Sequence, residues 1–389
     1  MAFFRLFIFI LFLLPFSAAN AQGASSEGIK FIHENFKEAL EKAQKEKKII
    51  FMDAYTTWCG PCKMMSKNVF SDADVAKLYN SQFINLKMDM EKGDGIGLMK
   101  RYDVSAFPTL LFLDGNGQLI HKAVGYFDAK GFIDLGKTAL DSDKSLGAWT
   151  TKYENGSKDA AFLKEYALKL AAAYDKRRIK VAEDYLTTQS DWNTPENLDF
   201  IYRFTEGVDS KFFDYLIKNK KVFENRYSAS EIDIKIQGLV SDCLFNEKNL
   251  PSLGFADSTI QKVYPTTADQ TAKKYRMSYF RMKGDREKYA DAAIIYFKKY
   301  NKSAEELSEA ATTFFEQIGD KKLLKKALDW SKKAVKLDNS YFNNLTLANI
   351  YQGLDKKAKA IKAAQNAIDI AKKNEEAYTE AEDLLKSLN

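Results

Sequence analysis

Cysteine and histidine are scarce in this chain. Its 389 residues include three cysteines and two histidines, His33 and His121. A small secreted domain stapled by disulfides carries an even set of at least about four cysteines, so this count speaks against such a framework. A zinc site needs several ligands at a suitable spacing, and Cys243 and the two histidines are not grouped with the pair Cys59 and Cys62. We therefore expect no metal and no other cofactor.

The chain also lacks a large excess of charge of either sign. Lysine and arginine number 59, aspartate and glutamate 53, and the formal net charge is +6. The basic residues alternate with acidic ones, as in KEALEKAQKEKK over residues 37–48, which is typical of a solvated helix face. No concentrated basic patch or base-stacking pattern accompanies the charge, so we expect no nucleic-acid partner. The balance of 46% hydrophobic and 29% charged residues indicates a folded globular protein of two or three domains.

One apolar run, residues 6–16, follows a single positive charge at Arg5. Small residues come next and end in Ala19-Asn20-Ala21, which matches the A-x-A pattern of a cleavage site. The run is shorter than the ~20 residues that span a bilayer. We expect a cleaved signal peptide over residues 1–21 and a mature chain that starts near Gln22, with an uncleaved anchor as the alternative. The mature protein is then periplasmic or secreted, in an oxidising compartment.

Strand and helix patterns alternate from residue 33 to residue 142, after a linker over residues 22–32. IIFMDAY (49–55) and FINLKMDM (83–90) are short apolar runs rich in strand-forming residues. Two further apolar runs around the turn Asp114-Gly115-Asn116-Gly117 predict a hairpin. This order predicts an α/β domain, a mixed sheet covered by helices. Helical patterns lie at residues 33–47, 61–70, 71–79, 96–102 and 128–140.

Residues 150–389 lack strand patterns and are rich in helical ones. A period of 33 residues appears near the end, because Ala327 and Ala334 precede Ala360 and Ala367 by that spacing. Small residues at such a period allow the two helices of a hairpin to approach closely. The pattern predicts an all-α region built of helical hairpins.

Residues 308–374 resemble two degenerate tetratricopeptide (TPR) repeats. Three residues occupy positions at which these repeats place a leucine, a small residue and a tyrosine: Leu347, Ala348 and Tyr351. Two repeats cannot bury a core unaided, so the helices before them should stack onto them. We expect a helical domain over residues 150–305 and TPR-like repeats over residues 306–389.

Cys59 and Cys62 form a C-x-x-C pair between a predicted strand and a predicted helix. As a structural staple, the pair would close so short a loop that it would constrain little of the unfolded chain. A redox couple fits better, because the partial positive charge at a helix N-terminus stabilises a thiolate at Cys59. Pro61 suits the first helical turn, and Gly60 has no side chain to block the sulfur. We expect an exposed Cys59 and a sheltered Cys62 that attacks a mixed disulfide.

The stretch Trp58-Cys59-Gly60-Pro61-Cys62-Lys63 resembles the active-site sequence of thioredoxins. Asp53 lies six residues before Cys59, where that family carries a buried carboxylate. Phe107-Pro108-Thr109 matches the family's cis-proline loop, and Gly125 fits a small residue that leaves room for the substrate. The resemblance covers about residues 33–142 and is greatest with exported members, such as the C-terminal domain of membrane thiol:disulfide interchange reductases.

The resemblance implies a role for each of these residues. Cys59 attacks the substrate disulfide, Cys62 resolves the intermediate as its partner in a redox-active disulfide, and Asp53 accepts the proton of Cys62. Lys87 aligns with a lysine that some thioredoxins place near the carboxylate, although strand alternation could equally turn it to solvent. The expected substrate-binding residues are Trp58, Gly60, Pro61, Phe107, Pro108 and Gly125.

The dipeptide Gly60-Pro61 between the cysteines is that of reducing thioredoxins. The resemblance therefore implies a thiol–disulfide oxidoreductase whose partners are disulfide-containing proteins and an upstream membrane thiol reductase that donates electrons. The helical region would dock a substrate or partner, or associate with itself. An isomerase and a helical-repeat adaptor with a purely structural thioredoxin-like module are the alternatives, and Cys243 is expected to be a buried, inert helix residue.

Overall fold

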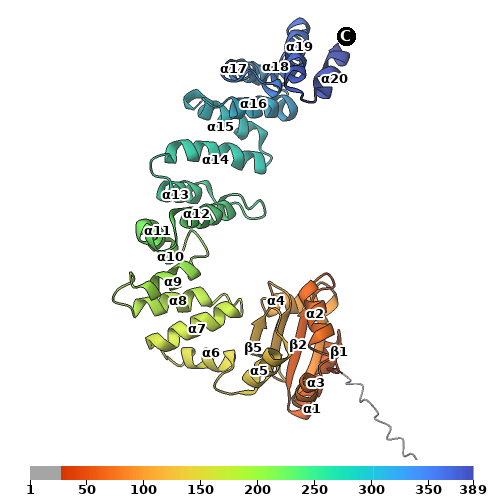
Figure 1. The fold of residues 1–389 in the computed structure, drawn as a ribbon, viewed down its shortest axis with the longest axis vertical. Coiled ribbons are helices and arrows are strands. Elements are labelled where there is room, and N and C mark those ends of the chain that lie inside the picture. The colour runs from red at the N-terminus through yellow and green to blue at the C-terminus, as the bar shows by residue number, and fades with distance from the viewer. Residues whose placement is uncertain (1–27, 301, 389) are drawn as a thin grey trace, which may run out of the picture. The chain divides into compact units, whose positions relative to one another are not determined.

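The computed structural model describes residues 28–300 and 302–388, shown as a ribbon in Figure 1. The predicted signal peptide, residues 1–21, lies outside the described residues. Contacts within the chain separate two compact units, one up to Trp192 and one from Asn193 onward. Among the described residues, no helix combines the length and the apolar character needed to cross a membrane.

The first unit contains a five-stranded sheet with the order β1-β3-β2-β4-β5. Its strands are β1 (Ile32–His33), β2 (Ile49–Tyr55), β3 (Phe83–Asp89), β4 (Thr109–Leu113) and β5 (Leu119–Val124). β1, β3 and β2 run parallel, whereas β4 and β5 form an antiparallel hairpin beside β2. The predicted mixed sheet is confirmed. β1 was not predicted, because two residues are too few to show an alternation of apolar and polar side chains.

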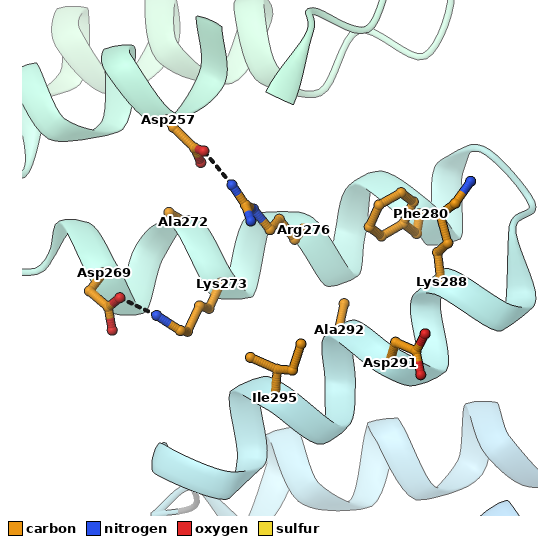
Figure 2. A pocket seen from close by; sticks show the side chains of 10 residues that line it. All are labelled: Asp257, Asp269, Ala272, Lys273, Arg276, Phe280, Lys288, Asp291, Ala292 and Ile295. Atoms are coloured by element: carbon orange, nitrogen blue, oxygen red, sulfur yellow. Dashed lines mark hydrogen bonds and ion pairs between the residues drawn. The ribbon is translucent and has the colours of Figure 1, made fainter. Parts of the chain in front are cut away.

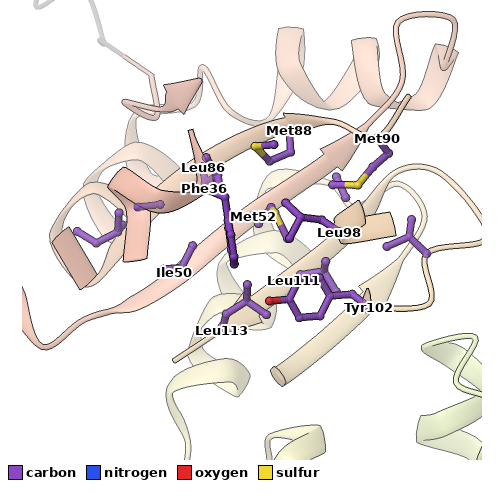
Figure 3. Packing of buried hydrophobic residues seen from close by; sticks show 14 of the residues in the cluster. Phe36, Ile50, Met52, Leu86, Met88, Met90, Leu98, Tyr102, Leu111 and Leu113 are labelled. Carbon is purple, nitrogen blue, oxygen red and sulfur yellow. The ribbon is translucent and has the colours of Figure 1, made fainter. Parts of the chain in front are cut away.

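One face of the sheet packs against two helices, α1 (Phe36–Glu46) and α4 (Gly93–Arg101). Side chains alternate between the two faces of a strand, so Ile50 and Met52 of β2 point into this layer. Figure 3 shows the resulting core, in which aliphatic and methionine side chains from three strands lie around Phe36 and Tyr102. Its other buried members include Leu86, Met88, Met90, Leu98, Leu111 and Leu113.

The opposite face packs against three helices, α2 (Gly60–Asn68), α3 (Ala73–Gln82) and α5 (Ala129–Leu140). The core of this layer is largely aromatic. The rings of Tyr79 and Phe132 stack at 4.2 Å, and the Tyr79 hydroxyl donates to the Phe132 carbonyl at 2.8 Å. Phe51 belongs to this layer, and Asp53, two residues further along β2, shares its face. Asp53 therefore lies on the side of the sheet that α2 covers.

Most of these helices begin after a residue whose side chain caps the helix N-terminus. Asn35, Asp72 and Asp128 each accept a hydrogen bond from a backbone N–H in the first turn of the helix that follows. α4 begins three residues before the predicted helix at 96–102. Its N-cap residue, Lys92, makes no side-chain hydrogen bond, and the first turn contains two glycines, so the usual start signal is absent.

Three further helices complete the first unit, α6 (Leu146–Glu154), α7 (Ala160–Ala172) and α8 (Arg178–Thr187). α6 begins against β5, where Nδ1 of His121 accepts the backbone N–H of Leu146 at 3.0 Å. The loop before α8 forms a second contact, since Nζ of Lys176 lies 2.6 Å from Oδ1 of Asp103 at the end of α4. Two polar contacts thus connect these helices to the sheet domain.

The second unit consists of helices. They are α9 (Pro195–Phe204), α10 (Lys211–Lys218), α11 (Lys220–Arg226), α12 (Ala229–Leu244), α13 (Leu253–Val263), α14 (Ala268–Met282), α15 (Arg286–Lys299), α16 (Ala304–Thr313), α17 (Lys321–Leu337), α18 (Tyr341–Gly353), α19 (Lys357–Asn374) and α20 (Thr379–Leu388). α16 continues into a π-helical turn, Phe314–Ile318, which ends at Gly319. Consecutive helices pack as hairpins, most extensively α16 with α17 and α18 with α19. The predicted all-α region with TPR-like hairpins is confirmed.

The alanines that define the 33-residue period lie inside these hairpins. Ala327 and Ala334 of α17 and Ala360 and Ala367 of α19 all have an exposed fraction of 0%. A larger side chain at any of these positions would push two helices apart.

We expect acidification to loosen the contact between β5 and α6. Burial, and to a smaller extent the positive charge of Lys169, lowers the pKa of His121 to about 4. The neutral imidazole is therefore favoured in the folded junction. The contribution of the neutral His121 to the free energy of unfolding is complete above a pH of about 6.5. As the pH falls toward 4 this contribution is lost, and the free energy of unfolding decreases by at most about 3 kcal/mol. Hydrogen exchange of the Leu146 amide, corrected for its intrinsic pH dependence, measures this loss.

The variant His121→Gln provides the control for this experiment. Glutamine offers Leu146 an acceptor that does not titrate, so the protection of this amide should change little between pH ~7.5 and pH ~4.5. Equal protection of Leu146 in the unmodified chain at both pH values would contradict the role assigned to His121.

Candidate active site

Cys59 and Cys62 lie at the start of α2. Cys59 is the N-cap residue, and its Sγ accepts the backbone N–H of Cys62 at 3.1 Å. The two sulfurs form a disulfide, with the Cα atoms 5.3 Å apart. The exposed fraction is 3% for Cys62 and 2% for Cys59. Cys59 is thus buried in this oxidised state, whereas the sequence predicted an exposed Cys59. Its sulfur is bonded to Cys62 and accepts the backbone N–H of Cys62.

The start of α2 favours a negative charge at Cys59. Backbone N–H groups at a helix N-terminus carry a partial positive charge. The first turn contains no acidic side chain, and Pro61 occupies it. A Cβ added to Gly60 would meet no atom within 4 Å apart from its chain neighbours and the backbone of its own helix, so the turn between the cysteines is open on that side. A thiolate formed at Cys59 by reduction of the disulfide would be stabilised in this position.

Asp53 is buried on β2 beside Lys87. The exposed fraction of Asp53 is 1%, and its Oδ2 lies 3.3 Å from Nζ of Lys87. β2 and β3 pair so that the two residues are directly opposite each other. Neither carboxylate oxygen has a hydrogen-bond partner among the described residues. Burial raises the pKa of Asp53 to about 6, an increase that the charge of Lys87 reduces. Asp53 can therefore exchange a proton near neutral pH.

Lys87 is shared between several neighbours. Its Nζ donates a hydrogen bond of 2.6 Å to Oγ of Ser66 on α2. The same ammonium lies 4.9 to 5.7 Å from the centres of three aromatic rings, those of Tyr55, Phe70 and Phe31. Such rings stabilise a cation in a partly buried position. The Lys87 ammonium therefore lies next to Asp53 while it also contacts Ser66 and the three aromatic rings.

The cis-proline loop forms the second part of the site. The peptide bond between Phe107 and Pro108 is cis, as the resemblance implied. The backbone N–H of Gly125 donates to the Pro108 carbonyl at 2.9 Å, which connects the loop to the end of β5. Gly125 has a φ of +102°, a conformation that residues with a side chain rarely adopt. A glycine is therefore required at this position by the backbone.

Trp58 joins the active-site loop to the cis-proline loop. Its ring meets that of Phe107 edge-on, with the centres 5.9 Å apart. The indole Nε1 donates to the carboxylate of Glu91 at 3.0 Å, and 65% of the residue is exposed. Met64 on α2 is also 48% exposed. An accessible apolar surface next to a reactive disulfide is suited to binding a polypeptide.

The sequence did not indicate Ser66 and Glu91 as residues of this site, and it left the orientation of Lys87 open. Ser66 follows Cys62 by four positions, which places both on one face of α2, and Glu91 lies two residues after the end of β3. The orientation of Lys87 follows from its register with Asp53. That register depends on which strands pair, and the alternation within a single strand does not specify it.

The cavities of the second unit involve different residues. Figure 2 shows one of about 400 Å³ between α13, α14 and α15, where Arg276 pairs with Asp257. Another, of about 350 Å³, is bordered by Cys243, a half-buried thiol whose pKa is raised by burial and by the charge of Asp209. Within residues 28–300 and 302–388, no group of three His, Cys, Asp or Glu side chains is arranged to hold a metal ion.

Comparison with known proteins agrees with the geometry at the two cysteines. Residues 36–140 match a family model described as a thioredoxin-like domain. Over 85 residues the chain is 38% identical to thioredoxin-1 of Drosophila yakuba, a match that covers 22% of this chain and 73% of that protein. The chain belongs to the thioredoxin family.

Other relatives match the thioredoxin-family chain over a limited part of its length. The thiol:disulfide interchange protein DsbD of Colwellia psychrerythraea is 32% identical over 117 residues, which are 29% of this chain and 19% of that protein. The chain thus spans about a fifth of the length of this relative. The solution structure of a putative disulphide-isomerase from Bacteroides thetaiotaomicron is 48% identical, covers 31% of this chain and 98% of that one, and has a TM-score of 0.29.

We expect Asp53→Asn to stabilise the oxidised thioredoxin domain at neutral pH. Because burial raises the pKa of Asp53 from 3.8 to about 6, the folded state holds this proton more tightly than the unfolded state. The cost of ionising the carboxyl group appears as the pH rises above 3.8 and is complete above about 6. Asparagine avoids this cost, which is at most about 3 kcal/mol. Urea unfolding followed by tryptophan fluorescence at pH ~4 and pH ~7.5 measures the difference.

The matched control is Asp74→Asn, at an exposed position in the first turn of α3. This variant should show no gain that increases with pH. A gain for Asp53→Asn of equal size at both pH values would contradict the raised pKa of Asp53.

Proposed function

We propose that this protein is a thiol–disulfide oxidoreductase that reduces the disulfides of other proteins. The observation that supports the proposal is the Cys59–Cys62 disulfide at the N-terminus of α2, on the face of the sheet that carries the buried Asp53. An adaptor with a purely structural module would need neither the two cysteines at the start of α2 nor a buried carboxylate whose pKa is raised to about 6.

The first step starts from the dithiol form of the site. The thiolate of Cys59 attacks one sulfur of the substrate disulfide, so that a bond forms between Cys59 and the substrate while the substrate S–S bond breaks. The other substrate sulfur leaves as a thiolate and takes a proton from solvent. The N-terminus of α2 stabilises the attacking thiolate.

In the second step Cys62 resolves this mixed disulfide. Its thiol gives a proton to Asp53, and the thiolate attacks Sγ of Cys59. The Cys59–Cys62 bond forms, the bond to the substrate breaks, and the second substrate sulfur leaves and is protonated. With a pKa of about 6, Asp53 is ionised at neutral pH and can accept that proton. One substrate disulfide is reduced and one dithiol is oxidised in each turnover.

The substrate segment is proposed to lie across the surface formed by Trp58 and the cis-proline loop. Phe107 and Pro108 would align its backbone, Gly60 and Pro61 leave its path to Cys59 open, and Gly125 adds no side chain in the way. The edge-on packing of Trp58 on Phe107 supports this placement, because it fixes the two loops to each other.

The reducing direction follows from the Gly60-Pro61 pair between the cysteines. With a signal peptide over residues 1–21, the protein would be periplasmic or secreted, where thiols are not kept reduced by the surroundings. An upstream membrane thiol reductase would then have to reduce Cys59–Cys62 after every turnover. The helical region is proposed to dock the protein substrate or a partner.

The two cysteines should have separable effects on activity. Cys59→Ser removes the attacking sulfur, so insulin reduction by dithiothreitol in the presence of the variant should fall to the uncatalysed rate. Cys62→Ala keeps the first step and blocks the second, so it should accumulate substrates as mixed disulfides on Cys59 that a reductant releases. Cys243→Ser is the control and should retain full activity; loss of activity in this variant, or activity in Cys59→Ser, would contradict the assignment.

The reduction potential distinguishes a reductase from an oxidant. We expect a value near that of thioredoxin, about −270 mV, when the protein is equilibrated with glutathione buffers and alkylated. A value near about −120 mV, as in the strong oxidant DsbA, would overturn the proposed direction. Reactivation of scrambled ribonuclease exceeding that of the Cys62→Ala variant, combined with weak insulin reduction, would identify an isomerase instead.

A further inference from the structure

One helix, α17, carries a large excess of positive charge. α17 contains seven lysines and a single acidic residue, Asp329. The whole chain has a net charge of only +6, so the charge of this one helix equals that of all 389 residues. The alternation of acids and bases expected along the sequence does not hold here. Such an imbalance on one element is a feature of surfaces that meet anionic partners.

The lysines lie along one side of α17, in two groups separated by Asp329. Its buried side consists of Leu324, Ala327, Leu328, Ser331 and Ala334. Six lysines, which we call the lysine stripe, lie on the remaining surface: Lys322, Lys325, Lys326, Lys332, Lys333 and Lys336. Lys322 lies three and four residues from Lys325 and Lys326, Lys336 lies three and four residues from Lys333 and Lys332, and the two groups are seven residues apart with Asp329 between them. Residues at these intervals share one face of a helix. From Lys322 to Lys336 the stripe extends roughly 21 Å at 1.5 Å per residue.

Among the described residues, the acids near α17 form no ion pair with the lysine stripe. Within the part of the chain that the structure describes, none of its six lysines has an ion-pair partner, whereas Lys321 pairs with Asp355. α18, which packs against α17, contains no charged residue at all. The acidic groups on or beside α17 are Asp320, which caps the helix, Asp329 within it, and Asp338 at its end. α16 and its π-helical turn add Glu305, Glu306, Glu309 and Glu316.

A second basic helix lies next to the same hairpin. α19 contains five lysines and one aspartate and packs against α18, as α17 does. α16 and α18 also contact each other. α17 and α19 therefore belong to the same layer of the stacked hairpins, and both contribute positive charge to it.

Apolar side chains are exposed where the stripe ends. Leu337 at the C-terminus of α17 is 49% exposed, and Phe342 in the first turn of α18 is 47% exposed. Lysine and arginine beside exposed leucine or phenylalanine are typical of surfaces that lie on a bilayer, since the charges meet headgroups while the apolar groups enter the boundary below them. An acidic protein segment would account for the lysines and leave the two apolar side chains unexplained.

We propose that the lysine stripe of α17, with Leu337 and Phe342, docks this protein on an anionic phospholipid surface. Five of the six lysines are exposed and Lys333 is half-buried, so their charges can face a planar array of phosphate groups. The lysine side chains are long enough to reach headgroups while the helix axis stays parallel to the membrane. The contact is peripheral and independent of the state of Cys59 and Cys62.

Vesicle sedimentation tests the proposal. The chain from Gln22 onward, which retains every described residue, is mixed with vesicles of phosphatidylglycerol and phosphatidylcholine or of phosphatidylcholine alone. We expect binding to the anionic vesicles that weakens at high salt and is at least about tenfold weaker for neutral vesicles. Lys322→Glu, Lys326→Glu and Lys333→Glu combined should weaken binding to the anionic vesicles by at least about tenfold.

Two further variants make the result specific. Lys37→Glu, Lys42→Glu and Lys45→Glu combined alter the same number of lysines on α1 and should leave binding unchanged. Leu337→Ala combined with Phe342→Ala should weaken binding without changing its dependence on salt. Circular dichroism confirms that each variant is folded, and Lys→Gln replacements at the three stripe positions substitute for any variant that is not. Equal binding to both kinds of vesicle, no binding, binding of an acidic peptide instead, or a stripe variant that binds like the unmodified chain would overturn the proposal.

Discussion

A carboxylate buried in the middle of a sheet is the constraint on which the redox site depends. β2 is the central strand and is covered by helices on both faces, so Asp53 is withdrawn from water. Such a charge is unfavourable unless a partner lies close to it. The parallel pairing of β2 and β3 supplies Lys87 at the opposite position. Since β2 also leads directly into the loop that carries Cys59, one strand positions both Asp53, the proposed proton acceptor, and the active-site sulfur.

The helical region is not attached to the sheet domain by a linker alone. α6 starts on β5, because the His121 side chain accepts the N–H of Leu146 and so acts in place of a backbone acceptor. Lys176 then reaches Asp103 at the end of α4, the helix that precedes the cis-proline loop. The redox domain thus shares polar contacts with the first helices of the helical region. Through β5 and α4, this junction is connected to the cis-proline loop, which is proposed to hold the substrate.

The sequence was informative where a pattern is local. Short apolar runs rich in strand-forming residues predicted β2 and β3, the 33-residue period predicted the hairpins of α17 and α19, and the residues around Cys59 indicated the family. What it did not predict depends on contacts between elements. β1 is defined only by its pairing with β3. Lys87 lies on the same face of the sheet as Asp53 because the register of β2 and β3 places the two residues opposite each other. The lysine stripe was overlooked because average charge along a sequence does not reveal how charges are distributed around a helix.

Cys59 combines two functions in one atom. Its sulfur is both half of the disulfide and the group that caps α2 by accepting the N–H of Cys62. A thiolate is a stronger acceptor than a disulfide sulfur, so reduction strengthens the cap of the helix. By thermodynamic linkage, the energy that the helix gains on reduction is also energy that favours the dithiol. The difference in strength between the two forms of this one hydrogen bond therefore contributes to the reduction potential of the protein.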